Sequence, residues 1–157
     1  MDYRIVERDA FHVVGRTLQT TCRDGQNSRD IPAFWGRCHS DGTVERLEAL
    51  GGLALGVCLP MAVGSDDLTY MVGVEAGPEA IGDGLIGYTV PAATWAVFAS
   101  VGPLPGAIQQ TFVRIFQEWF PATGYEHAFA PELEMYTDGD TNADDYRCEV
   151  WIPIVKK

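Results

Sequence analysis

The sequence lacks paired cysteines, a leader segment and a long apolar run. Its four cysteines, at positions 22, 38, 58 and 148, show neither the CxxC spacing of zinc and redox motifs nor the density of a secreted disulfide scaffold. We therefore expect free thiols in a reducing cytosol. No basic segment followed by apolar residues opens the chain, and no apolar run approaches the ~20 residues that a membrane span needs. These absences predict a cytoplasmic protein with no membrane-embedded part.

Basic residues are scarce. The chain has 11 Lys and Arg residues against 22 Asp and Glu residues, for a formal net charge of -11. Such a surface repels a phosphate backbone and attracts cations at modest ionic strength, so direct nucleic-acid binding is not expected. Residues 1–78 hold 7 basic and 11 acidic residues, and residues 79–157 hold 4 and 11. A cation site is therefore expected in the second half.

Motifs for cofactors, metals and nucleophilic catalysis are missing or incomplete. Residues 82–87 match GxGxxG, but the expected strand follows this segment instead of preceding it, which argues against a dinucleotide site. Residues 138–149 partly match a calcium loop, yet Ala143 replaces the glycine at the sharp bend. The three histidines lack zinc-ligand spacing, and no GxSxG elbow is present. We expect no cofactor and no metal.

Hydrophobic periodicity and turn residues divide the chain into two similar halves. The first predicts a strand over 3–20, a helix over 31–50 and strands over 53–59 and 68–75; the second predicts a strand over 88–101, a helix over 105–120 and strands over 132–136 and 146–155. This order predicts an α+β fold of two βαββ repeats, about 1–78 and 79–157, in one domain. Each repeat would place one helix on an antiparallel sheet, and the paired sheets would leave a central ligand cleft.

The segment 131–136 alternates between carboxylates and apolar residues. Glu132, Glu134 and Tyr136 fall on one face of the predicted strand, and Leu133 and Met135 fall on the other. A desolvated carboxylate costs free energy unless a cation, a hydroxyl or a proton compensates it. Glu134 is therefore a candidate ligand-binding acid. The alternative is that this face of the strand looks into solvent.

Aromatic side chains are candidates for the walls of the cleft. Trp35 follows Phe34 by one residue, about 100° around a helix, so the two cannot point at the same neighbour. Trp95 and Phe98 fall on opposite faces of an ideal strand, so one should line the cleft and the other the core, with Trp95 favoured for the cleft. The candidate aromatic ligand contacts are Trp35, Trp95, Tyr136, Phe98, Tyr70 and Tyr88.

The element order, together with the segments 31–35, 70–74 and 131–136, resembles the gyrase-inhibitor-like small-molecule-binding domain. This fold serves as the effector-binding module of several bacterial multidrug-responsive transcription regulators. The resemblance implies that Glu134 lies in the cleft and faces the cationic part of a ligand, with aromatic rings around it. No helix-turn-helix region precedes the first strand, so the sequence is expected to be a stand-alone member.

The resemblance and the residues leave three functions open. The favoured one is binding of amphipathic, cationic small molecules, with Glu134 as counter-charge. The second is hydrolysis of strained-ring or reactive electrophiles, with Glu134 as general base or water-orienting group and Tyr136 or Tyr88 as acid. The third is an acidic interaction protein that docks on a basic partner such as a topoisomerase. Catalysis is thus an open alternative, and binding is preferred to it.

Overall fold

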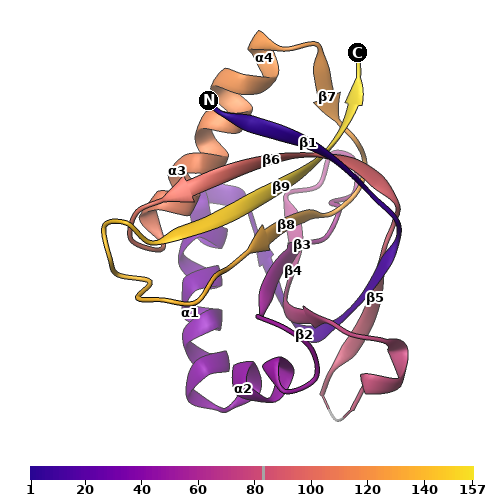
Figure 1. Ribbon diagram of the computed structural model, residues 1–157, viewed down its shortest axis with the longest axis vertical. Coiled ribbons are helices and arrows are strands. Elements are labelled where there is room, and N and C mark those ends of the chain that lie inside the picture. The colour runs from indigo at the N-terminus through magenta and orange to yellow at the C-terminus, as the bar shows by residue number, and fades with distance from the viewer. Residues whose placement is uncertain (83) are drawn as a thin grey trace.

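A computed structural model describes residues 1–82 and 84–157. Within these residues nine strands form one sheet, in the order β1-β6-β9-β8-β3-β4-β2-β5, with β7 also paired to β9 (Figure 1). The strands are β1 (Tyr3–Arg8), β2 (Phe11–Thr21), β3 (Leu55–Cys58), β4 (Asp67–Glu75), β5 (Ile86–Val90), β6 (Ala93–Val101), β7 (Tyr125–His127), β8 (Glu132–Met135) and β9 (Arg147–Lys156). The helices are α1 (Gln26–Ser40), α2 (Thr43–Glu48), α3 (Gly106–Arg114) and α4 (Phe120–Ala122), and a π-helical turn, Ile115–Trp119, joins α3 to α4.

The sheet curls round so that its two ends meet. Tyr3 pairs with Phe98 and Phe11 pairs with Val90 in one continuous antiparallel register, which makes β1 and β2 one bent strand facing another made of β5 and β6. The α+β class predicted from the sequence is confirmed. The predicted pair of separate sheets is replaced by a single sheet, because backbone hydrogen bonds between β3 and β8 join the two halves.

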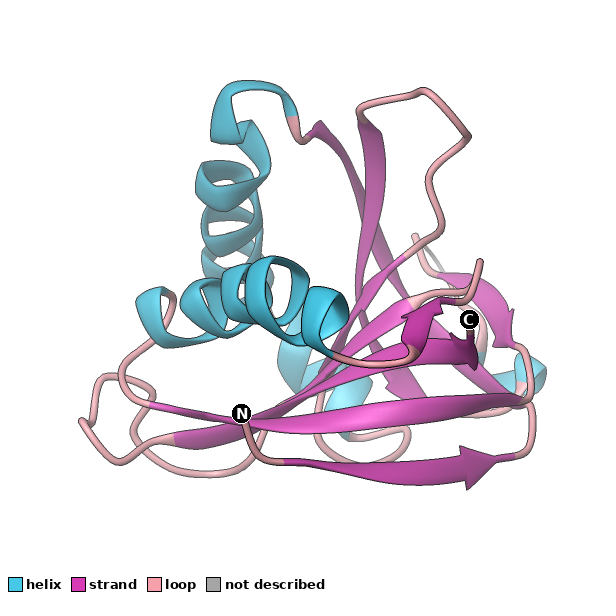
Figure 2. Cartoon of the chain, turned by 90° about the horizontal axis from the view of Figure 1, so that it is seen from above, coloured by secondary structure: helices cyan, strands magenta, loops and turns pink. Residues whose placement is uncertain are grey.

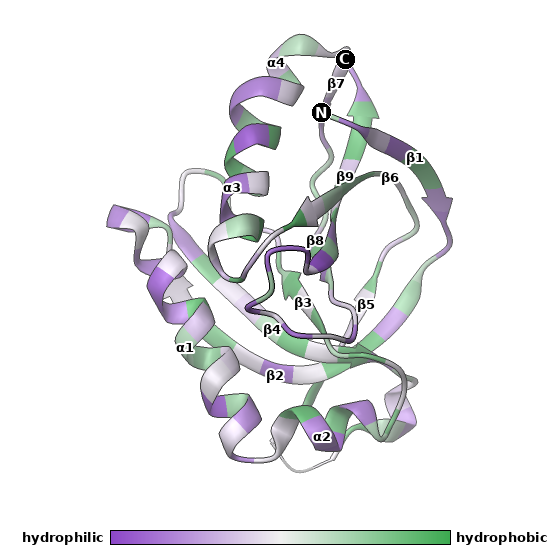
Figure 3. Cartoon of the chain, turned by 60° about the vertical axis from the view of Figure 1, so that its left-hand side comes forward, coloured by the Kyte–Doolittle hydropathy of each residue, from purple (hydrophilic) through white to green (hydrophobic). Residues whose placement is uncertain are grey.

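Three apolar layers follow from the alternation of side chains along the curled sheet. The inside of the curl is filled by Val57, Met71 and Leu133, among others. Outside it, α1 and α2 cover β2 and β4, and the helical segment that begins with α3 covers β6 and β9. Figure 2 shows these helices gathered on the outer surface of the sheet, and Figure 3 shows hydrophilic and hydrophobic residues alternating along α1 and α3.

The first helix differs from its predicted bounds. It begins at Gln26 rather than near Pro32, and it ends before Gly42, whose φ of +84° separates α1 from α2. The apolar periodicity runs through both helices, so it did not reveal this break. Pro32 has no N–H for the carbonyl of Ser28, four residues earlier. Gln109 Nε2 on α3 donates to that carbonyl instead, at 3.0 Å, and this bond ties α1 to α3.

Two segments of the chain carry partial matches to known binding motifs, over residues 82–87 and 138–149. The GxGxxG match over 82–87 includes Asp83, which lies outside the described residues, and β5 begins within it at Ile86. Residues 136–146 form the connection between β8 and β9. Among the residues that the structure describes, no group of three or more His, Cys, Asp or Glu side chains is placed to hold a metal ion. No helix in the described part of the chain is long and apolar enough to cross a membrane.

Candidate functional site

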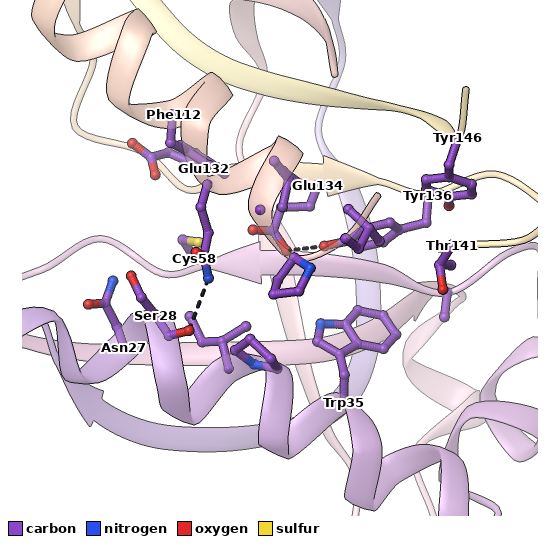
Figure 4. Close-up of a pocket in the computed structure, with 18 of the residues that line it drawn as sticks. Asn27, Ser28, Trp35, Cys58, Phe112, Glu132, Glu134, Tyr136, Thr141 and Tyr146 are labelled. Atoms are coloured by element: carbon purple, nitrogen blue, oxygen red, sulfur yellow. Dashed lines mark hydrogen bonds between the residues drawn. The ribbon is translucent and has the colours of Figure 1, made fainter. Parts of the chain in front are cut away.

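A hollow of about 1010 Å³ lies between α1, α3 and the outer face of β3 and β8. The sequence alternation places Glu134 on this outer face, while Leu133 points into the curled sheet and is fully buried. On the neighbouring strand, Gly56 pairs with Glu134. Because Gly56 has no side chain, it leaves room beside the carboxylate. Figure 4 shows Glu134 in the hollow beside Tyr136, with Trp35 of α1 below them.

The Glu134 carboxylate is held by one of its two oxygens. The hydroxyls of Tyr70 and Tyr136 both donate to Oε1, the second at 2.9 Å. Trp35 Nε1 donates in turn to the Tyr70 hydroxyl, at 2.7 Å. Oε2 accepts no hydrogen bond from any described residue, and the 6% of Glu134 that stays exposed borders the hollow. One oxygen is therefore fixed, and the other is available to a ligand.

Burial dominates the protonation of this group. Desolvation raises the pKa of Glu134 above its ordinary value of 4.5, and the charge of Glu132 adds to this, while the hydrogen bonds from Tyr70 and Tyr136 lower it. Burial, followed by the charge of Glu134, raises the pKa of Tyr70 and of Tyr136 well above 10. Both phenols thus stay neutral and act as hydrogen-bond donors.

The wall of the hollow carries negative charge. Four carboxylate residues line it: Glu48, Glu132, Glu134 and Asp138. Within the described part of the chain, neither lysine nor arginine lines it. A positively charged guest would therefore meet attraction, and an anionic guest would meet repulsion, in a site where the reduced dielectric constant strengthens both.

Two of the predicted aromatic contacts line this hollow, and a third lies behind them. Trp35 and Tyr136 line it, with ring centroids 5.1 Å apart and planes at 75°. Tyr70 lies behind them, fully buried, where it links Trp35 to Glu134. The Phe34 side chain, one position before Trp35, is buried against the sheet. Trp35 thus faces the site while its neighbour packs in the core.

The other three aromatic candidates do not reach the hollow. Trp95, favoured from the sequence, fills the inside of the curled sheet beside Trp151, and half-buried Tyr88 packs against the same layer. Phe98 packs under the α3 segment against Trp119. The prediction of opposite faces for Trp95 and Phe98 was correct, but placing one of them in the cleft was wrong. Because β6 is covered on both faces, each of its sides is core.

Several residues that line the hollow were not predicted. Cys58, on β3, pairs with Glu132 across the strands, and Gln109, Phe112 and Phe116 come from α3 and the turn that follows it. The only signal for the two phenylalanines was the apolar stripe of the helix predicted over 105–120. Packing against the sheet explains such a stripe equally well. Cys58 and Gln109 carried no local signal.

The chain resembles known proteins over almost its whole length. Residues 1–155 match the family model described as "GyrI-like small molecule binding domain". The structure of SAV2435 bound to tetraphenylphosphonium is similar, with 25% identity, a TM-score of 0.87 and coverage of 99% of this chain and 94% of that one. A putative bacterial transcription regulation protein from Staphylococcus aureus MU50 shows 26% identity, a TM-score of 0.80 and 98% coverage of both chains.

A hydrolase from Listeria innocua shares the fold, with 8% identity, a TM-score of 0.52 and coverage of 98% of this chain and 91% of that one. None of the curated proteins compared with the chain matches it significantly.

Proposed function

The chain belongs to the GyrI-like small-molecule-binding domain family, and from this premise we propose that it binds amphipathic organic cations in the hollow around Glu134. One observation carries the proposal: a buried carboxylate has one oxygen held by two tyrosines and the other without a hydrogen bond from the described residues. Such a carboxylate gains most from a positive partner. The tetraphenylphosphonium ion bound to SAV2435 is a ligand of this class.

The walls suit a bulky or delocalised cation. Such an ion is weakly hydrated and loses little on leaving water, while each aromatic ring that it covers returns about 0.5 to 2 kcal/mol through cation–π attraction. Trp35 and Tyr136 offer such rings beside Glu134. We expect affinities of micromolar order, about -8 kcal/mol, for lipophilic cations.

The hollow lies where two halves of the chain join, and these halves are proposed to be copies of one βαββ unit. When β1, β2, β3 and β4 are exchanged for β5, β6, β8 and β9, the strand order read from the other end of the sheet is the same as before. The central pair, β3 and β8, would then be equivalent strands. One of them supplies Glu134, and the other supplies the glycine beside it.

The direct test is a thermal-shift screen with cationic, neutral and anionic dyes of similar size. A ligand present at 100 times its Kd stabilises the folded state by about 2.7 kcal/mol, which is roughly 5 to 10 °C for a chain of this size. Cationic dyes should raise the melting temperature by this amount, and anionic dyes should leave it unchanged. Equal shifts for both signs of charge would contradict the proposal. A binding protein should also return the dye chemically unchanged, whereas turnover beyond one equivalent would support the hydrolase alternative.

The affinity for cations should rise with pH. Because burial raises the pKa of Glu134, part of the population is protonated at pH values where an exposed glutamate is already ionised. A bound cation favours the carboxylate, so affinity should increase as the pH rises through the raised pKa of the ligand-free protein and then level off. Isothermal titration calorimetry in buffers of different ionisation enthalpy should detect protons released on binding. The Glu134→Gln variant should show no such release at this site, and the same release from that variant would assign the titration to another group.

A further inference from the structure

Glu132 is a second carboxylate in the same hollow, and it has a different environment from Glu134. The two residues lie two positions apart on one face of β8, which separates their Cα atoms by about 6.6 Å. Both line the hollow. Glu134 is almost fully buried, whereas the Glu132 side chain keeps 19% of its exposure. A single ligand that lies along β8 would therefore lie next to both carboxylates.

Glu132 repeats the arrangement of a carboxylate that is held by one oxygen. Its Oε2 contacts His127 Nε2 at 2.9 Å, and its Oε1 accepts no hydrogen bond from the residues that the structure describes. The His127 ring stacks on Phe116, with centroids 6.0 Å apart and planes at 22°. Phe116 is 45% exposed and lines the hollow. The hollow thus combines a carboxylate and an aromatic ring a second time, with Glu132 and Phe116 in addition to Glu134 and its rings.

The contact between His127 and Glu132 indicates which kind of chemical group Glu132 and Phe116 can hold together. The two ring nitrogens of His127 face oxygen acceptors, the Ala128 carbonyl at Nδ1 and Glu132 at Nε2, and only the protonated ring donates at both. The His127 ring, which is a flat aromatic cation when it is protonated, thus lies on Phe116 and against Glu132. An exogenous flat cation that reaches Oε1 from the hollow would meet the same groups.

We propose that Glu132 and Phe116 form a second cationic subsite, and that the protein takes elongated aromatic dications more tightly than monocations of the same shape. The proposal rests on the proposed function, because the first charge of the dication would lie at Glu134. The second charge would lie at Glu132, farther along β8. His127 limits the gain, because its protonated form offsets part of the charge on Glu132.

The test uses two probes that differ in one charge. Methyl viologen carries a methylated quaternary nitrogen at each end of a flat two-ring skeleton, and N-methyl-4-(4-methylphenyl)pyridinium keeps both methyl groups and has carbon in place of one of the two nitrogens. Calorimetric titrations of both into the full chain should show the dication binding about threefold to tenfold more tightly. Glu132→Gln should reduce this ratio to about one while changing the monocation affinity less than about twofold. The matched control is Glu126→Gln, a carboxylate on β7 that does not line the hollow, and it should leave the ratio unchanged.

A further variant changes the same ratio in the opposite direction. His127→Phe keeps a ring against Phe116 and removes the competing charge, so it should increase the preference for the dication. The proposal is overturned if the dication binds no more tightly than the monocation, or if Glu132→Gln leaves the ratio intact. If the monocation still depends on Glu134 in that case, only the second subsite fails. If neither probe binds, or if Glu134→Gln changes neither affinity, the proposed function fails together with it.

Discussion

Replacing Glu134 with glutamine is expected to weaken the binding of a lipophilic cation by about 30- to 1000-fold, equivalent to about 2 to 4 kcal/mol. Glutamine has nearly the same shape, and its amide oxygen can still accept from Tyr70 and Tyr136 in the place of Oε1. The amide nitrogen then replaces Oε2, so the ligand meets a donor where it met a negative charge. The geometry of the site is kept, and its attraction for a cation is lost.

The same substitution should stabilise the ligand-free protein at neutral pH. The pKa of Glu134 is higher in the folded chain than its ordinary value of 4.5, so the folded state binds the proton more tightly than the unfolded state. The free energy of unfolding therefore falls as pH rises from about 4.5 through the raised pKa. Glutamine removes this loss. Weaker binding together with a higher melting temperature would distinguish a lost charge from a damaged fold.

Fluorescence titration with a lipophilic cationic dye measures the first effect, and thermal denaturation without ligand measures the second. Glu132→Gln is the matched comparison, because it removes a carboxylate two residues away on the same face of β8. For a monocation it should have a far smaller effect. Equal losses for the two variants would remove Glu134 from the centre of the site.

Replacing Gly56 with alanine is expected to abolish most of the binding through a single added methyl group. A Cβ at this position would overlap the Tyr70 hydroxyl and Glu134 Oε1. Tyr70 and Glu134 would have to move apart, which breaks their hydrogen bond and disturbs the bond from Trp35 to Tyr70. Overpacking and a buried polar group without its partner each cost about 1 to 3 kcal/mol. The affinity should fall about 100-fold, and the stability should fall by roughly 2 to 4 kcal/mol.

Chemical denaturation and cation titration of the same sample measure both quantities. Gly52→Ala is the control, since a Cβ there would meet no other atom within 4 Å, and it should bind like the unaltered protein. Ligand binding at full affinity in Gly56→Ala would show that the Tyr70 contact with Glu134 is not needed for recognition.

Local periodicity correctly predicted the strand that carries the acid. Leu133 and Met135 point to the inside of the curled sheet, and Glu134 points out into the hollow. A period of two residues is a property of the extended backbone, so it can be read from six residues without knowledge of the rest of the chain. The same reading could not show that the outer face is covered by helices. Solvent was an equally valid neighbour for Glu134 on that evidence.

Pattern reasoning failed where two different layers bury the same strand. Trp95 and Phe98 were correctly placed on opposite faces of β6, yet both faces are packed, one inside the curl and one under the α3 segment. The hydrophobicity of a side chain predicts that it is buried, but it does not predict which part of the structure covers it. The break between α1 and α2 at Gly42 was not predicted either, because the apolar positions continue in phase across it.

The sequence by itself determined the α+β class, the acidic character of the second half and the alternation that singles out Glu134, because these depend on composition and on neighbours a few residues apart. Only the tertiary structure decided that Tyr70 and Tyr136 share one oxygen of Glu134 and that Gly56 makes room beside it. It also decided that Gln109 of α3 donates a hydrogen bond to the Ser28 carbonyl of α1 and so links these two helices. Most of these contacts join residues more than 60 positions apart in the sequence. Which of these residues meet depends on how the sheet curls as a whole.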